Sequence, residues 1–405
     1  MSRRRVAVTG LGMICANGAD VATVWPALLA GRCGTGPITT IDTARIGART
    51  AGEVRDFDPL AHFGHKRVAM LDRAAQFAVV AAREAMADAG LATLPPGAAS
   101  ERAGAILGGP VGQVTNDAGY AQFYGSGSNR VHPFTVPRLM PSASASQVSA
   151  DLGLRGPSYA VASACASAAH AIGQAFHAVA SGMLDLAVAG GSDAPLAPGV
   201  IRAWESLRVL SPDVCRPFSR DRAGLVLGEG AGMLVLEPWD LAVARGARIH
   251  GEVAGIGMSA DAADLTAPDA DGAARAMRAA LADAGEDADA VGYVNAHGTG
   301  TRLNDLTETE ALRRVFGARL PDIPVSSVKS MLGHTLCAGG GIEAVATILA
   351  LRDGVLPPTA NFREADPECA LDCIPDGARR TRARLALSNS FAFGGLNAVL
   401  ALRRA

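Results

Sequence analysis

The chain has 405 residues, of which 49% are apolar and 19% charged, and its formal net charge at pH 7 is −2. This length predicts about two to three domains with a large buried core, and the near-neutral charge gives no reason to expect a nucleic acid or a membrane surface as partner. No run of about 18 uncharged apolar residues is present, which excludes a predicted membrane span.

The N-terminus and the cysteines predict a cytoplasmic protein. Basic residues at positions 3–5 lead straight into a strand, without the apolar core of a secretory signal. Seven cysteines, an odd number without a CxxC pair, fit a reducing compartment better than a disulfide framework. Cys369 and Cys373 are too isolated to suggest a metal site, so no metal is expected.

Strands and helices alternate in the first half. In order, we expect a strand over 5–9, an amphipathic helix over 72–89, a strand over 103–107, a buried strand that runs into Cys165, an alanine-rich helix ending at Gly182, and strands over 186–189 and 232–236. The stretch 115–144 is polar and irregular, and we expect a loop there that covers a pocket or meets a partner.

The second half, from residue 248 on, predicts the same alternation. In order, it contains a helix from Ala273, strands over 291–296 and 324–328, a helix over 342–353 and two closing strands around a glycine turn. A strand, a turn and a helix of small residues occur in both halves, at 158–182 and at 325–354. This pattern predicts an α/β fold with largely parallel sheets, in which two buried helix N-termini meet on a pseudo-twofold axis.

Cys165 lies where an apolar stretch with the β-forming residues Tyr159 and Val161 turns into the alanine-rich helix. The unpaired N–H groups and the positive dipole end of that helix favour a thiolate. Small neighbouring residues leave room for a substrate beside the sulfur. Two interpretations are open at this point, a nucleophile and an inert core cysteine.

Two histidines, His297 in NAHGTGT and His334 in KSMLGHT, each lie in a glycine-rich turn that follows a strand. Such turns hold reactive side chains on a rigid scaffold yet open to substrate. Of the other six histidines, His170 and His177 lie on the Cys165 helix, where a hydrogen-bonded core role is expected. The cysteine and the two histidines in turns together indicate a catalytic set.

Two chemistries are compatible with this set. A papain-like hydrolase uses one histidine to deprotonate the thiol, whereas two neutral imidazoles can donate N–H groups to a carbonyl oxygen on which enolate charge develops. Lys329 and Glu308, near the histidines in sequence, could form an ion pair that tunes them, or a solvated surface pair. Lys329 is one of only two lysines in the chain, which suggests that an ammonium group is needed there.

The sequence resembles the β-ketoacyl-acyl carrier protein synthases, condensing enzymes of the thiolase superfamily, along essentially its whole length. The synthase I/II type and its type II polyketide relatives share the Cys-His-His set. The motifs that carry the resemblance are VTGLGM (8–13), GLRGPS (153–158), SACAS around Cys165, RPFSRDRAGLVLGEGAG (216–232), HGTGT (297–301), VKSMLGHT (328–335) and NSFAFGGLN (389–397).

The resemblance implies a thiolase-like α/β fold, in which two similar halves form a five-layered αβαβα sandwich. The first half, residues 1–247, carries the nucleophile, and the second, residues 248–405, carries the two histidines. No resident cofactor is implied, because the substrates are carried on the 4′-phosphopantetheine of acyl carrier protein. The implied assembly is a homodimer, or a heterodimer with a subunit like a chain-length factor.

The resemblance also implies residue roles. Cys165 takes the acyl chain as a thioester, and His297 and His334 bind the malonyl thioester and promote decarboxylation; the enolate then attacks the Cys165 thioester and releases a 3-ketoacyl carrier protein. Supporting roles are implied for Lys329 and Glu308 beside the histidines. The backbone N–H groups of Cys165 and Phe393 are implied to form the oxyanion hole, and the Phe393 side chain to act as a gate. Thr299 and Thr301 are implied to bind the pantetheine arm, Val111 to line the acyl pocket, and Arg208, Lys66 and Arg67 to contact the carrier protein.

The chain departs from the family pattern near the site. It has AFGGLN, with Ala392 and Leu396, where the family usually has GFGGTN, and Ala166 follows the nucleophile in place of the common threonine. These departures leave the Cys-His-His set intact, and they suggest a specialised acyl chain, such as a polyene or a lipochitooligosaccharide acyl group. The alternatives are a non-condensing partner subunit, which usually lacks the cysteine, and a coenzyme A thiolase or thioester hydrolase.

Overall fold

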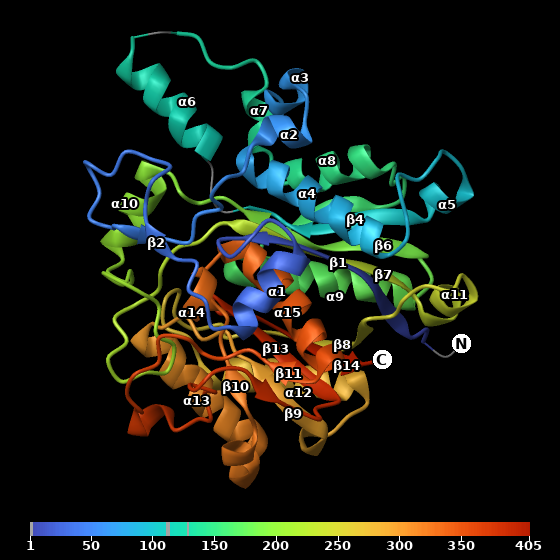
Figure 1. The fold of residues 1–405 in the computed structure, drawn as a ribbon, viewed down its shortest axis with the longest axis vertical. Helices are drawn as coiled ribbons and strands as arrows, with labels where there is room; N and C mark the ends of the chain where they lie inside the picture. The colour runs from blue at the N-terminus through green and yellow to red at the C-terminus, as the bar shows by residue number, and fades with distance from the viewer. Residues whose placement is uncertain (1–2, 111–113, 128) are drawn as a thin grey trace.

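The computed structural model describes residues 3–110, 114–127 and 129–405 (Figure 1). Its main feature is one mixed sheet, to which ten strands of the described residues contribute. In sheet order these strands are β10 (Val325–Ser326), β9 (Val291–Asn295), β13 (Leu385–Ala392), β14 (Leu396–Arg404), β8 (Gly251–Ala260), β1 (Val6–Cys15), β7 (Gly230–Pro238), β6 (Leu186–Asp193), β4 (Ala103–Gly108) and β5 (Ser158–Val161).

β1 and β8 join two half-sheets of the same plan, and they pair only over residues 6–8 of β1. Moving outward from this junction, each half-sheet has two antiparallel pairs followed by two parallel pairs. The prediction of largely parallel sheets is therefore wrong. Strands that follow each other directly, such as β13 and β14 around Gly394 and Gly395, can pair only antiparallel.

Helices form three further layers around and between the half-sheets (Figure 1). The central layer is α9 (Ser167–Ala180) with α15 (Gly339–Asp353), and each of these helices contacts strands of both half-sheets. The outer layers are α4 (Arg73–Asp88) with α8 (Ala143–Leu152) on one side and α12 (Ala270–Ala284) with α13 (Arg302–Phe316) on the other. The predicted five-layered sandwich of two similar halves is confirmed, while the boundary between residues 247 and 248 stays a prediction.

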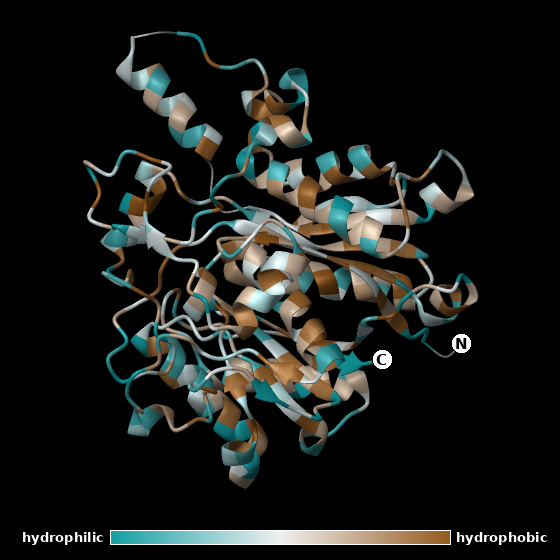
Figure 2. Ribbon diagram, in the orientation of Figure 1, coloured by the Kyte–Doolittle hydropathy of each residue, from teal (hydrophilic) through white to brown (hydrophobic). Residues whose placement is uncertain are grey.

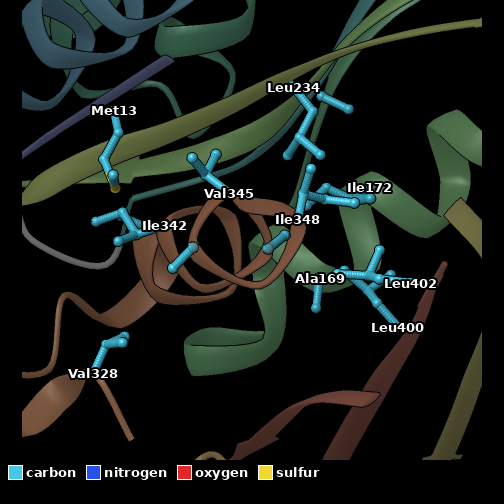
Figure 3. Packing of buried hydrophobic residues seen from close by; sticks show 14 of the residues in the cluster. Met13, Ala169, Ile172, Leu234, Val328, Ile342, Val345, Ile348, Leu400 and Leu402 are labelled. Carbon is cyan, nitrogen blue, oxygen red and sulfur yellow. The ribbon is translucent and has the colours of Figure 1, made fainter. Parts of the chain in front are cut away.

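The core is centred on α15, which is buried along nearly its whole length. Figure 3 shows Ile342, Val345 and Ile348 of this helix among apolar side chains that come from both half-sheets. Glycine allows the close approach, because a Cβ on Gly232 of β7 would lie 2.2 Å from the backbone nitrogen of Ile342. An all-round apolar helix is typical of such a central layer, and Figure 2 shows that polar residues gather on the outer helices.

Shorter elements complete the fold. They are α1 (Val21–Leu29), β2 (Gly36–Pro37), β3 (Thr50–Ala51), α2 (Pro59–His62), α3 (His65–Val68), α5 (Ala98–Glu101), α6 (Val114–Gly125), α7 (Thr135–Leu139), α10 (Pro198–Ser206), α11 (Trp239–Ala244), α14 (Lys329–Leu332), β11 (Val355–Leu356) and β12 (Arg379–Arg380). No helix of the described residues is long and apolar enough to cross a membrane.

The stretch 115–144, predicted as an irregular loop, is largely helical. It forms most of α6, all of α7 and the start of α8. α6 buries only Thr115 and projects from the body of the molecule (Figure 1). Because it packs no apolar stripe against this chain, its sequence lacks the 3.6-residue periodicity that signals a helix.

Candidate active site

Cys165 lies in the 3₁₀ turn Ala164–Ala166, directly before α9. Ala164 has a φ of 47°, a left-handed conformation that is strained for a residue with a Cβ. The same geometry recurs before α15, where Leu336 has a φ of 47° in the turn Leu336–Ala338. The two turns contact each other, so the predicted meeting of two buried helix N-termini is confirmed.

Cys165 is a thiol in the free protein, because burial raises its pKa to about 12. The ammonium of Lys329 and the backbone N–H groups of Cys165 and Phe393 act in the opposite direction, but they do not outweigh the loss of solvent. The backbone N–H groups at the helix start thus act in the predicted direction, and burial is the larger effect. Activation of this sulfur requires a base in the same pocket.

His297 and His334 reach the pocket from two turns of the second half. His297 lies just after β9 and before Gly298, and His334 lies between α14 and the turn that leads into α15. Both side chains are buried. Their rings meet edge to face, with centroids 5.3 Å apart and an angle of 84° between the planes. The two histidines therefore form one unit.

Lys329 is fully buried behind His297. Its Nζ pairs with the carboxylate of Glu343 on α15 and lies 3.4 Å from Nδ1 of His297. The predicted ion pair of Lys329 with Glu308 is therefore wrong, because the carboxylate that pairs with Lys329 is that of Glu343. Because an ammonium group can only donate, Nδ1 of His297 accepts, and the proton of the neutral ring is on Nε2.

Glu308 fixes the turn that carries His297. Its carboxylate accepts the backbone N–H of His297 at 2.9 Å, that of Gly298 at 2.8 Å and the Nδ2–H of Asn389 at 3.0 Å. Burial raises the pKa of Glu308, and these donors lower it in part. Glu308 thus fixes the backbone of this turn, and its supporting role in catalysis stays a prediction.

Both imidazoles are neutral at pH 7. Burial is the largest cause that holds the pKa values of His297 and His334 well below the ordinary histidine value, and the charge of Lys329 lowers both further. A neutral ring can accept a proton at one nitrogen or donate one from the other. The pair can therefore donate two N–H groups while both rings are uncharged, and a ring that acts as base takes up a proton and becomes positively charged.

The side chains of Cys165, His297 and His334 line one pocket of about 400 Å³. Of the other predicted site residues, Thr299, Thr301, Phe393 and Arg208 also line it, and the hydroxyls of the two threonines are 2.8 Å apart. Lys66 and Arg67 lie on α3 and are not among the lining residues, and Arg67 pairs with Asp151. Val111 lies outside the described residues, so its place in an acyl pocket stays a prediction.

Two residues of the site were missed in the sequence. Glu343 carries a detectable signal, because it is the single charged residue in the stretch 339–351, and a buried charge requires a partner. Trp204 lines the pocket and stacks on Phe393. No local pattern marks it, since it lies on a short amphipathic helix far from the other motifs.

Replacing Lys329 by methionine is expected to raise the pKa of His297, because the nearby positive charge is removed. The pKa stays below the ordinary histidine value, since burial is the larger cause and remains. The double variant Lys329→Met/Glu343→Gln separates this effect from that of the unpaired Glu343 carboxylate. NMR titration of the histidine ring protons measures the shift.

The control for this variant is Lys66→Met, which removes the only other lysine and leaves the histidine titration unchanged. The expectation is contradicted if His297 titrates at the same pH in the wild type and in the double variant.

The chain matches the family models of the beta-ketoacyl synthase N-terminal domain over residues 3–242 and C-terminal domain over residues 250–363. It is 47% identical over 401 residues to nodulation protein E of Rhizobium leguminosarum bv. trifolii, with 99% of each chain covered. It is 42% identical over 409 residues to 3-oxoacyl-[acyl-carrier-protein] synthase 2 of Staphylococcus aureus (strain COL), covering 99% of this chain and 98% of that protein.

Solved structures agree with the sequence relatives. A structure titled "The ishigamide ketosynthase/chain length factor" superposes with a TM-score of 0.94 at 39% identity over 100% of both chains. A beta-ketoacyl synthase from Burkholderia phymatum STM815 gives a TM-score of 0.92 at 38% identity, covering 99% of this chain and 100% of that one. With its thiolase-like fold, the chain belongs to the β-ketoacyl synthase family, the ketosynthases that carry out acyl condensation.

Proposed function

We propose that this ketosynthase joins an acyl group held on Cys165 to the two-carbon unit of malonyl-acyl carrier protein, with loss of carbon dioxide. The observation that carries the assignment of residues is the convergence of Cys165, His297 and His334 on one pocket. A hydrolase needs one histidine, whereas two neutral imidazoles in edge contact suit a developing enolate.

In the first step the acyl group moves from the pantetheine sulfur to Cys165. The Cys165 sulfur forms the new thioester bond, the bond to the pantetheine sulfur breaks, and the thiol proton ends on the released pantetheine. Since burial keeps Cys165 protonated, a base must take this proton first. The neutral imidazole of His334 is the proposed base, because Nδ1 of His297 already accepts from Lys329 and Nε2 of His297 carries the proton.

In the second step malonyl-acyl carrier protein loses its carboxylate as carbon dioxide, and the electron pair of the broken C–C bond forms an enolate. The thioester oxygen takes up negative charge, and N–H donation from His297 and His334 stabilises it. Lys329 donates a hydrogen bond to Nδ1 of His297. The proton of the neutral ring is therefore on Nε2, and this nitrogen is the one that can donate to a substrate.

In the third step the enolate carbon attacks the thioester carbon on Cys165. Negative charge moves to the thioester oxygen, and the proposed hydrogen-bond donors to this oxygen are the backbone N–H groups of Cys165 and Phe393, which contact the sulfur. Collapse of this intermediate breaks the C–S bond and releases 3-ketoacyl-acyl carrier protein. The Cys165 thiolate takes up one proton from solvent, which replaces the proton that left with the pantetheine thiol in the first step, and the cycle closes.

Acyl carrier protein is the proposed partner, and its phosphopantetheine carries both substrates. Exposed arginines surround the pocket mouth: Arg208 lines it, and Arg302, also part of the lining, has a side chain that is 78% exposed. One solved relative, at 30% identity and a TM-score of 0.89, is a type II polyketide synthase acyl carrier protein in complex with its ketosynthase. We propose that Thr299 and Thr301, which line the same pocket, hydrogen-bond the pantetheine arm.

We also propose a homodimer. β5 is an end strand of the sheet, so its outer edge is unpaired within the described chain, and Tyr159 on it is exposed. The projecting α6 carries the exposed aromatics Tyr120 and Tyr124. Unpaired edges and apolar patches of this kind are usually covered in the assembled protein.

Sedimentation at micromolar concentration is expected to show twice the chain mass. Replacing the outward-facing Tyr159 by lysine places charges on the unpaired edge and is expected to shift the protein toward single chains. A wild type that sediments as a single chain at all concentrations contradicts the homodimer, and a stable species only with a second, different subunit favours the heterodimer.

A specialised acyl chain and a cytoplasmic location complete the proposal. Relatives named for nodulation and for ishigamide support a product other than a common fatty acid, and seven free cysteines support a reducing compartment. The test is incubation with malonyl-acyl carrier protein and a series of acyl carrier proteins of increasing acyl length. 3-Ketoacyl-acyl carrier protein is expected; free fatty acid alone, or activity with coenzyme A thioesters only, contradicts the assignment.

A further inference from the structure

Three buried polar atoms behind the catalytic histidines lack hydrogen-bond partners. They are Nδ1 of His334, Oγ1 of Thr335 and Oε2 of Glu343, and no group among the described residues pairs with any of them. The three residues are at most 1% exposed. Unpaired polar groups in a protein interior are costly, and such groups are usually satisfied by an ordered water where no side chain reaches them.

The three side chains converge on Gly339, the first residue of α15. A Cβ on Gly339 would lie 3.7 Å from Oγ1 of Thr335 and 3.9 Å from both Nδ1 of His334 and Oε1 of Glu343. No atom outside its own helix backbone and its chain neighbours is nearer.

Glycine is not required at position 339 by the fold. Its φ is −51°, an ordinary helical value, and the contacts of a Cβ would be normal van der Waals contacts. Because alanine is the better helix former, the glycine lowers the stability of the helix without relieving strain or crowding. What it does provide is a place for a small molecule among the three polar side chains.

A water molecule matches this set of polar groups. A buried water typically makes about three hydrogen bonds to groups that are otherwise unpaired, and the set offers an imidazole nitrogen, a hydroxyl and a carboxylate oxygen. A cation is disfavoured, because the ammonium of Lys329 already pairs with the carboxylate of Glu343.

We propose that one ordered water, held by Thr335 and Glu343, hydrogen-bonds Nδ1 of His334 and thereby prepares this histidine to deprotonate Cys165. Nδ1 faces Gly339, so the nitrogen left for the pocket is Nε2. For Nε2 to accept the thiol proton, the proton of the neutral ring must be on Nδ1, where it needs an acceptor. The water accepts this hydrogen bond and donates one to Glu343.

The resulting chain of groups runs from Cys165 through His334 and the water to Glu343. It orients the base as a third residue does in other cysteine and serine enzymes. Thr335 and Glu343 are positioning residues in this arrangement, because they act through the water. The inference rests on the proposed loading of an acyl group onto Cys165.

The same water serves the second step differently. When His334 donates from Nε2 to the enolate oxygen, Nδ1 carries no proton, and the water can donate to it. This tautomer differs from the other by one proton lost at Nδ1 and one gained at Nε2, so the charge of the ring is unchanged. A buried N–H without an acceptor is rarer than an acceptor without a donor, so loss of the water affects the first step more.

The experiment is the substitution Gly339→Ala, whose methyl group displaces the water. Acylation of Cys165 by octanoyl-acyl carrier protein, followed by mass spectrometry, is expected to slow by about tenfold or more, as for the loss of a hydrogen bond to a charged group. Release of carbon dioxide from malonyl-acyl carrier protein is expected to stay near the wild-type rate. A crystal structure of the wild type should show the water, and one of Gly339→Ala should not.

The matched control is Gly119→Ala. Gly119 is also a helical glycine, on α6, and a Cβ there would meet nothing within 4 Å. Both rates are expected to be unchanged in this variant.

Two variants of Thr335 test the hydroxyl. Thr335→Val keeps the shape of the side chain and removes the hydroxyl, so it is expected to slow acylation as Gly339→Ala does. Thr335→Ser keeps the hydroxyl and is expected to retain the wild-type rate. The double variant Gly339→Ala/Thr335→Val is expected to be no slower than either single variant, because both changes remove the same water.

Four results overturn the proposal: wild-type acylation in Gly339→Ala, equal slowing of acylation and decarboxylation, a wild-type crystal structure without the water, and losses that multiply in the double variant. Failure of the proposed function is distinct from these. It would show as absence of Cys165 acylation in the wild type itself, and it would refute the base step together with the condensing function.

Discussion

Replacement of Cys165 by alanine is expected to abolish acyl-enzyme formation and condensation together. The sulfur is the atom that forms the new thioester, and Cys165 is the one thiol among the described residues that line the pocket. Serine at this position is expected to be nearly as inactive, because a buried hydroxyl is harder to deprotonate than the thiol it replaces. Mass spectrometry after incubation with acyl-acyl carrier protein should show one acyl group on the wild type and none on Cys165→Ala.

Cys337 provides a matched control. It occupies the corresponding turn of the second half, before α15, and its Sγ lies 3.3 Å from the carbonyl oxygen of Ala164. Burial, the largest cause, raises its pKa well above the ordinary value, and it does not line the catalytic pocket. Cys337→Ala should still be acylated. Acylation that persists in Cys165→Ala and disappears in Cys337→Ala would move the nucleophile to the other half.

Removal of either imidazole is expected to slow decarboxylation strongly. His297→Ala and His334→Ala each delete one N–H donor to the enolate oxygen, and the loss of such a donor costs on the order of 10²-fold or more in rate. Acylation of Cys165 should survive better than decarboxylation in at least one of the two variants, because His297→Ala leaves the imidazole of His334 as base. Carbon dioxide release from malonyl-acyl carrier protein measures the first activity.

His170→Asn is the control for these variants. His170 is also a largely buried histidine, but its Nδ1 lies 2.9 Å from the Ser163 hydroxyl and 3.1 Å from the Ala166 carbonyl oxygen, outside the pocket lining. Decarboxylation should therefore be unchanged. Wild-type decarboxylation in both His297→Ala and His334→Ala would instead indicate a cysteine hydrolase with one essential histidine.

The site was predictable from sequence because its members lie on short, unusual local patterns. A cysteine at a helix start and two histidines in glycine turns after strands are detectable without knowledge of the fold, and the repeat of one plan in two halves predicted that they converge. Lys329 stood out for a similar reason, as a rare lysine in a chain rich in arginine.

Partners and protonation states were less predictable, because they depend on contacts between distant segments. Lys329 on α14 pairs with Glu343 on the following helix, α15, through a turn that the sequence does not specify, and the helix start at Cys165 does not offset the burial created by both halves. Trp204 and α6 are hard to find for the opposite reason. Trp204 packs on the ring of Phe393, and α6 lines a groove. No hydrophobic periodicity in the sequence marks either feature.

The most direct test of the central claim follows one turnover on a single preparation. Cys165 is first loaded with an acyl group and freed of excess donor, and malonyl-acyl carrier protein labelled at its free carboxyl carbon is then added. Loss of the acyl group from Cys165, release of labelled carbon dioxide and formation of 3-ketoacyl-acyl carrier protein are expected in equal amounts. Loss of the acyl group as free acid, with the label retained on the carrier protein, would contradict the condensing mechanism.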